Sequence, residues 1–316
     1  MNTYKWSLTV GLLLGVIGGE AQQKAFTVVP LGVRGGLDES NLSAYMVTAA
    51  GRQDYICLDA GTLYAGLQKA VDNGVFSSPI GVILRNRIKA YFISHPHLDH
   101  VAGLIINSPE DSTKRIYGLS SCLEVLKTHY FTWQSWANFG DAGERPLNKY
   151  HYTIMEPGKE MVVGSTGLSV TAYSLSHGGP YESTAFLVRS GGASLLYLGD
   201  TGADSVEHSD KLYRLWQAVA PLVRAGTLKS IFIEVSFPNE QPDRSLFGHL
   251  TPRWLMEELG VLGRLAGRNS LKGWPVVITH RKPSGNQEEI IREELERNNP
   301  LQVKLVFPRQ GGKLEW

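Results

Sequence analysis

Apolar residues occur along the chain in short continuous runs separated by glycine-rich and polar turns. Runs of this length, rich in branched and aromatic residues, predict β-strands. They cover residues 26–33, 44–49, 55–61, 89–94, 168–176, 184–190, 193–200, 229–237 and 274–280. Four longer segments, with apolar residues three or four positions apart, predict helices over residues 62–74, 209–226, 251–267 and 286–299. The alternation of the two patterns predicts one mixed α/β domain.

Several predicted strands end on a histidine or an aspartate. His177 follows residues 168–176, Asp200 ends residues 193–200, and His280 ends residues 274–280. Each residue taken alone could be a cap or a core residue. Together they indicate a sheet edge lined with metal ligands, because catalytic metal sites combine imidazole and carboxylate ligands with an open position.

The segment "SHPHLDH", residues 94–100, concentrates this chemistry. It places three histidines and one aspartate directly after the predicted strand 89–94. Pro96 restricts the backbone between the first two histidines, so that both imidazoles can turn toward one point. The alternative is a polar loop with hydrogen-bonded histidines, but the combination of residues favours a site for zinc or a similar divalent ion. His129, His151 and His208 lack such a context and are expected at the surface.

The composition limits the classes of function that the protein can have. The 316 residues are 42% hydrophobic, which is enough for a substantial core. The 31 basic and 30 acidic residues give a net charge of +1, which does not indicate a nucleic-acid or membrane-surface partner. Two cysteines do not make a disulfide-built protein. Cys57 is expected in the core, and whether it pairs with Cys122 is open.

The N-terminus has the pattern of an export signal. Lys5 precedes the apolar residues 7–19, and the small residues Gly19 and Ala21 indicate cleavage after Ala21. The alternative is a membrane anchor, but the apolar run is shorter than the ~20 residues that a spanning helix needs. The sequence therefore predicts a signal peptide over residues 1–21, a mature domain over residues 22–316, and a secreted or periplasmic location.

The motif "SHPHLDH" resembles the signature of the metallo-β-lactamase fold superfamily, which implies a four-layer αββα sandwich and bound metal. The longer segment "HPHLDHVAGLIINSP", residues 95–109, resembles the signature of the class II cyclic nucleotide phosphodiesterases. Similar segments lie at residues 30–47, 116–119, 231–240, 246–252 and 278–284. The resemblance implies hydrolysis of 3′,5′-cyclic AMP, and of cyclic GMP with it, to the 5′-monophosphate.

The superfamily pattern implies a ligand set for two metal ions, with zinc expected and manganese or iron not excluded. It assigns His95, His97 and His177 to one ion, assigns Asp99, His100 and His280 to the other, and makes Asp200 the bridge. We expect Asp99 to be a catalytic residue as well as a metal ligand. Two such ions would lower the pKa of a shared water toward ~7 and supply hydroxide for attack on phosphorus.

A proton donor is expected from the segments "IFIEVSF" and "GHLTP". Their Glu234 and His249 resemble the paired glutamate and histidine of the tRNA 3′-processing nucleases in this superfamily. The similarity implies that Glu234 orients His249 and keeps it protonated, and that His249 acts as general acid on the leaving oxygen. The alternative is a structural ion pair, with His249 as a helix cap.

The aromatic segment 129–139 is a candidate base pocket. Trp136 or Phe139 could stack on a purine, and Asn138 could bond a base edge. The alternative is core packing or a subunit contact. The sequence leaves the oligomeric state open, a homodimer included.

Two other readings compete with the cyclic nucleotide phosphodiesterase. One is another hydrolase on the same fold, such as a lactonase, a thioesterase or an RNA-processing phosphodiesterase. The other is a non-catalytic metal-binding protein of the cell envelope, which would need no proton donor.

Overall fold

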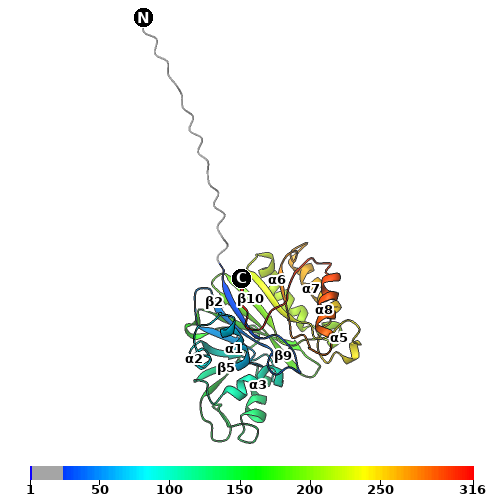
Figure 1. The fold of residues 1–316 in the computed structure, drawn as a ribbon. Coiled ribbons are helices and arrows are strands. Elements are labelled where there is room, and N and C mark those ends of the chain that lie inside the picture. The colour runs from blue at the N-terminus through cyan, green and yellow to red at the C-terminus, as the bar shows by residue number, and fades with distance from the viewer. Residues whose placement is uncertain (2–23) are drawn as a thin grey trace.

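Two seven-stranded sheets pack face to face between two groups of helices, which confirms the expected αββα sandwich (Figure 1). The computed structural model describes Met1 and residues 24–316. Except for Met1, the expected signal peptide lies outside the described residues. Among residues 24–316, no helix has the length and apolar character needed to cross a lipid bilayer.

The first sheet has the order β14-β1-β2-β3-β4-β5-β6. Its strands are β1 (Phe26–Gly32), β2 (Ala44–Ala49), β3 (Tyr55–Leu58), β4 (Ile88–Phe92), β5 (Lys114–Gly118), β6 (Tyr150–Ile154) and β14 (Leu314–Glu315). β1, β2 and β3 pair antiparallel, whereas β3 to β6 run parallel. The carboxyl ends of β3 and β4 therefore lie at the same edge.

The second sheet has the order β13-β12-β11-β10-β9-β8-β7. Its strands are β7 (Glu160–Val162), β8 (Ser169–Ser176), β9 (Glu182–Ser190), β10 (Ala193–Leu198), β11 (Leu228–Glu234), β12 (Pro275–Thr279) and β13 (Lys304–Val306). β10 to β13 are parallel, and β9 is antiparallel to both β8 and β10. The strands β8, β10, β11 and β12 consequently end at one edge.

Helices cover the outer face of each sheet. In Figure 1, α1 (Tyr64–Asp72), α2 (Ile80–Asn86) and α3 (Leu98–Asn107) lie with the first sheet. α5 (Asp204–Glu207), α6 (Lys211–Arg224), α7 (Pro252–Ala266) and α8 (Gln287–Arg297) lie with the second. α4 (Ser120–Val125) continues into a π-helical turn, Leu126–Tyr130. The start of α7 follows its sequence, because Thr251 accepts a hydrogen bond from the Trp254 amide and Pro252 takes the first helical position.

Alternate residues of the central strands face different cores. In β11, Ile231 and Ile233 pack under the helices with Trp216, whereas Phe232 packs between the two sheets with Tyr45. Successive side chains of a strand point to opposite faces, so a strand covered on both sides is apolar throughout. This burial explains the continuous apolar runs, and all nine predicted strands and four predicted helices are confirmed.

Residues 98–107 and the cysteines add detail that the sequence left open. Residues 98–107 form the helix α3, which is not among the four helices predicted from the sequence. Cys57 and Cys122 are both buried and, in the described part of the chain, both are free thiols.

Candidate active site

The ends of six strands, two from the first sheet and four from the second, bring the candidate residues together. In chain order, these residues are Asp59 after β3, His95 after β4, His177 after β8, Asp200 after β10, Glu234 at the end of β11, and His280 after β12. The site is therefore built at the junction of the two sheets.

His95, His97 and His177 form one group of ring nitrogens, the histidine group. His97 Nδ1 lies 3.1 Å from His95 Nε2 and 3.3 Å from His177 Nε2. His95 and His177 are buried, whereas His97, at the N-cap of α3, is exposed. Three imidazole nitrogens facing one point are a donor set that suits a divalent cation with an open coordination position.

Asp99, His100, Asp200 and His280 form a second group, the carboxylate group. His280 Nε2 lies 3.0 Å from Asp99 Oδ2 and 3.2 Å from Asp200 Oδ2. His100 Nε2 is also 3.2 Å from Asp200 Oδ2, yet within residues 24–316 this buried nitrogen has no hydrogen-bond partner. A buried, unsatisfied nitrogen beside two carboxylates fits a metal ligand.

Asp200 lies between the two groups. Its Oδ2 atom is 3.7 Å from His95 Nε2 and 3.9 Å from His177 Nε2, in addition to its closer approach to His100 and His280. Asp200 is only 2% exposed. One buried carboxylate therefore faces ring nitrogens of both groups, as expected for a bridging ligand.

Hydrogen bonds on the far side of the rings fix their orientation. His177 Nδ1 donates to the Gly248 carbonyl at 2.9 Å, and His280 Nδ1 lies 2.9 Å from Ser236 Oγ. His100 Nδ1 lies 2.8 Å from Asp59 Oδ2. Because Nδ1 is engaged in each ring, Nε2 is the nitrogen left to bind a metal.

Asp59 is the residue of the site that sequence reasoning missed. Its carboxylate also accepts hydrogen bonds from the Ser94 amide at 2.7 Å and from the Tyr197 hydroxyl at 2.6 Å. Asp59 and His280 both have left-handed backbone angles, with φ of 54° and 52°. Such angles are uncommon outside glycine and occur at functional sites. The signal was present, because "YICLDAG" ends a strand on an aspartate as the recognised segments do.

The two groups differ in electrostatics. Burial and the neighbouring His100 lower the pKa of His95 well below its usual value, and burial lowers the pKa of His177 to about 4. Burial acts in the same direction on His100 and His280, but Asp200 and other carboxylates outweigh it and raise both pKa values. The histidine group thus favours neutral rings, which are the metal-binding form, and the carboxylate group favours positive charge.

Glu234 and His249 are in direct contact beside the two groups. His249 Nδ1 donates to Glu234 Oε1 at 2.8 Å. Glu234 is fully buried, and its other oxygen accepts from Ser236 Oγ at 2.6 Å. Burial raises the pKa of Glu234, but the adjacent His249 outweighs burial and the net shift is downward. The contact leaves His249 Nε2 for other partners, and Lys282 Nζ lies 3.2 Å from it.

Two glycines allow the backbone to approach the ligands. A Cβ atom at Gly35 would lie 2.3 Å from His280 Cε1, and one at Gly248 would lie 2.1 Å from the Gly178 amide nitrogen. Gly248 also has a φ of 79°. Both contacts are too short for any side chain, so these positions require glycine.

Trp136, Asn138 and Phe139 have other contacts. Asn138 is 1% exposed, and its amide nitrogen donates to the carbonyls of Ala142 and Glu144. Trp136 Nε1 donates to Ser108 Oγ, and Phe139 packs edge-on against Phe131. Among the described residues, none of these three lines the hollow beside the histidine group. Their contacts match the core-packing alternative. His129 and His208 are exposed, as expected, whereas His151 is half-buried.

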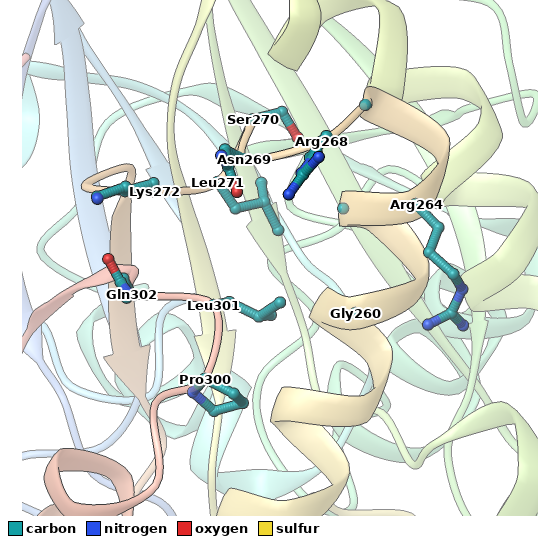
Figure 2. A pocket seen from close by; sticks show the side chains of 12 residues that line it. Gly260, Arg264, Arg268, Asn269, Ser270, Leu271, Lys272, Pro300, Leu301 and Gln302 are labelled. Atoms are coloured by element: carbon teal, nitrogen blue, oxygen red, sulfur yellow. The ribbon is translucent and has the colours of Figure 1, made fainter.

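Two hollows differ in their relation to the ligands. One, of about 310 Å³, is lined in part by His95, His97 and His177. A larger one, of about 710 Å³, lies between the end of α7 and the loops near Leu271 and Leu301 (Figure 2). Its wall carries Arg268 and Lys272, but of the described residues that line it none is a candidate metal ligand. The smaller hollow is therefore the one that adjoins the candidate metal ligands.

The chain is similar to known proteins over nearly its whole described length. The family model for class-II cAMP phosphodiesterases matches residues 24–311. A 3′,5′-cyclic-nucleotide phosphodiesterase of Aliivibrio fischeri is 45% identical over 319 residues, which cover 96% of this chain and 96% of that protein.

Solved structures agree on the fold. Unliganded yeast PDE1 superposes with a TM-score of 0.80 at 23% identity, over 93% of this chain and 100% of the yeast chain. The metallo-β-lactamase fold protein YhfI of Bacillus subtilis superposes with a TM-score of 0.61 at 17% identity, over 93% of this chain and 100% of that one.

Proposed function

The chain belongs to the class-II cAMP phosphodiesterase family and is a hydrolase of 3′,5′-cyclic nucleotides, and on that premise we propose that it converts cyclic AMP, and cyclic GMP as well, to the 5′-monophosphate. The observation that carries the proposal is the pair of donor groups facing the single buried carboxylate of Asp200. A phosphodiester is anionic and resists attack by water, and such a site addresses both difficulties.

Two divalent cations, with zinc as the expected ion, would be held by the histidine group and the carboxylate group, with Asp200 between them. Ions held there would supply a water of lowered pKa and would neutralise charge on the phosphoryl oxygens. The buried position of Asp200 and the contacts of Nδ1 in His100, His177 and His280 support this ligand set. Asp99 contributes a carboxylate whose Oδ2 accepts from the Gly36 amide at 2.9 Å.

His249 is the proposed general acid. Glu234 accepts the Nδ1–H bond and thereby fixes the ring, so that Nε2 carries the proton that passes to the leaving ribose 3′ oxygen. Glu234 is itself held by Ser236 and by the Thr201 amide at 3.1 Å. A buried carboxylate with this many donors is a fixed partner for the ring.

The protein is also proposed to be exported, with residues 1–21 removed. Lys5 and the apolar residues 7–19 support this. Expression of the full-length gene, followed by cell fractionation and N-terminal sequencing, tests it: an N-terminus at Gln22 in the periplasm or medium agrees, and an intact N-terminus in the cytoplasm contradicts it. Light scattering on the same material distinguishes a homodimer from a single chain.

The test of the activity is hydrolysis of cyclic AMP and cyclic GMP by the purified protein with and without a chelator. Chelator-sensitive release of the 5′-monophosphate is expected. Release of the 3′-monophosphate, or turnover of a lactone, a thioester or RNA in place of the cyclic nucleotide, would contradict the proposal.

A further inference from the structure

We propose that the hollow beside the histidine group is the nucleobase site, with Tyr181 stacking on the base and Glu182 accepting hydrogen bonds from its edge. This assignment rests on the proposed cyclic nucleotide substrate. The hollow measures about 310 Å³, at the small end of the range for ligand pockets. It shares His95, His97 and His177 with the site, so a phosphate held there has its nucleoside within reach of the hollow.

Part of the lining of the hollow is apolar. Pro96, Cys122, Val125 and Pro180 line it. Burial raises the pKa of the Cys122 thiol, so this residue is a small apolar surface and not a nucleophile. Apolar surface of this kind suits the face of an aromatic base.

Tyr181 stands at the mouth of the hollow, in the turn between β8 and β9. It is 66% exposed, and its backbone carbonyl accepts from the His177 amide at 3.3 Å. The turn thus ties an exposed aromatic ring to a residue of the histidine group. A ring so placed is available to stack on a base, an interaction of ~1–3 kcal/mol per base in single-strand binding proteins.

Glu182 and Lys211 provide an acceptor and a donor side by side. Glu182 Oε1 accepts from Lys211 Nζ at 2.9 Å and from Ser174 Oγ at 2.8 Å, and Oε2 lies 3.3 Å from Ser121 Oγ. The hydrogen bond from Lys211 is the main cause of a lowered pKa at Glu182, so the carboxylate is ionised and only accepts. Both side chains remain about one third exposed.

This pair matches the edge of either purine. Adenine presents an N6–H donor next to a ring nitrogen acceptor, and guanine presents N1–H next to the O6 acceptor. Guanine adds a second donor, N2–H, which a carboxylate can accept together with N1–H. The geometry therefore admits both cyclic AMP and cyclic GMP, and it makes cyclic GMP more dependent on Glu182.

Tyr181→Ala and Glu182→Gln test the two contacts. The assay compares cyclic AMP, cyclic GMP and an abasic ribose 3′,5′-cyclic phosphate, which has the same phosphodiester and no base. Tyr181→Ala should raise KM for both cyclic nucleotides ~10-fold or more, with kcat for the abasic compound unchanged. Glu182→Gln should raise KM for cyclic GMP at least ~5-fold more than for cyclic AMP.

Matched control variants show whether removal of any exposed tyrosine or any cation changes KM. Tyr64→Ala removes a tyrosine that is 60% exposed at the start of α1, and Lys272→Ala removes a cation at the other hollow (Figure 2). Both should behave as the unmodified protein. Phe247→Ala tests the other exposed aromatic residue near the histidine group. The backbone of Phe247 lies close to Gly178, because its carbonyl oxygen would be 3.2 Å from a Cβ placed there.

The outcomes separate this assignment from the function on which it rests. If the unmodified protein hydrolyses cyclic nucleotides but Tyr181→Ala leaves KM unchanged, or Phe247→Ala alone raises it, the base lies elsewhere and the assignment is wrong. If Glu182→Gln leaves the ratio of KM for cyclic GMP to KM for cyclic AMP unchanged, the Glu182–Lys211 pair stabilises the structure and does not contact the base. No turnover of any cyclic nucleotide by the unmodified protein would overturn the proposed function itself.

Discussion

The histidine group and the carboxylate group lie side by side and differ in almost every physical respect. The first offers three imidazoles, one of them exposed, and burial lowers the pKa values of its rings. The second offers two imidazoles and the carboxylates of Asp99 and Asp200, which raise the pKa values of His100 and His280 against the effect of burial.

This difference indicates that the two groups would bind metal differently. The histidine group lines the hollow, and burial favours the neutral form of its rings. The carboxylate group is buried except for Asp99, carries the negative charge of two carboxylates, and contacts Asp59 and Ser236 through the Nδ1 atoms of its rings. For the two ions proposed above, this asymmetry favours tighter binding in the carboxylate group and easier access in the histidine group.

Removal of the shared residue should have the largest effect. Asp200→Asn keeps the size of the side chain and removes the negative charge that faces both groups. We expect loss of at least one metal equivalent by elemental analysis, and turnover of cyclic AMP reduced ~1,000-fold or more, at the upper part of the range for a single catalytic group. Full metal content together with near-normal turnover would show that Asp200 does not join the two groups.

The next largest effect is expected outside both groups, at His249. His249→Ala should slow hydrolysis of cyclic AMP by ~100- to 10,000-fold, because proton donation to a basic leaving oxygen is lost. A p-nitrophenyl phosphodiester, whose leaving group needs no proton, should be hydrolysed almost normally. Equal losses on the two substrates would assign His249 to metal or substrate binding.

Gly35→Ala should separate the two groups. The added Cβ would lie 2.3 Å from His280 Cε1, so His280 must move and the carboxylate group should lose its ion while the histidine group keeps one. Gly192→Ala is the matched control, because no described atom lies within 4 Å of a Cβ at that position. Metal content of two equivalents in Gly35→Ala would contradict the crowding that the geometry describes.

Asp59→Asn should have the smallest effect and should act mainly on the carboxylate group, because Asp59 contacts His100 Nδ1 directly and reaches His95 Nδ1 only through Ser94 Oγ. It weakens the hydrogen bond that holds His100 Nδ1 and leaves all direct ligands in place. Partners of this kind typically change metal affinity by ~10- to 100-fold. Competition with a chelator should show one of the two ions weakened by about that factor, and equal weakening of both would argue against separate groups.

Sequence reasoning recovered the strands that are buried on both faces and missed those at the edges of the sheets. The strands β6, β7, β13 and β14 stand at the four sheet edges. They are two to five residues long and mostly half-buried or exposed, so they have no continuous apolar run. β5 was also missed, because Lys114 and Arg115 interrupt its pattern. Lys114 is nevertheless buried, where it forms an ion pair with Asp111.

Prediction of the site from the sequence was limited in a similar way. The seven expected ligands were recognisable because each stands in a motif or at a strand end, and the fold brings all seven into two groups. The hollow for the base could not be read in this way. Cys122, Tyr181 and Lys211 come from three separate segments, and each is unremarkable in its own stretch of sequence.

The most direct test of the account is turnover of cyclic AMP while metal is returned to the chelated protein. We expect no activity in the metal-free protein, and release of 5′-AMP that reaches its full rate only as the second equivalent of zinc binds. Full activity at one equivalent, or in the metal-free protein, would contradict the claim that the two groups act together through Asp200.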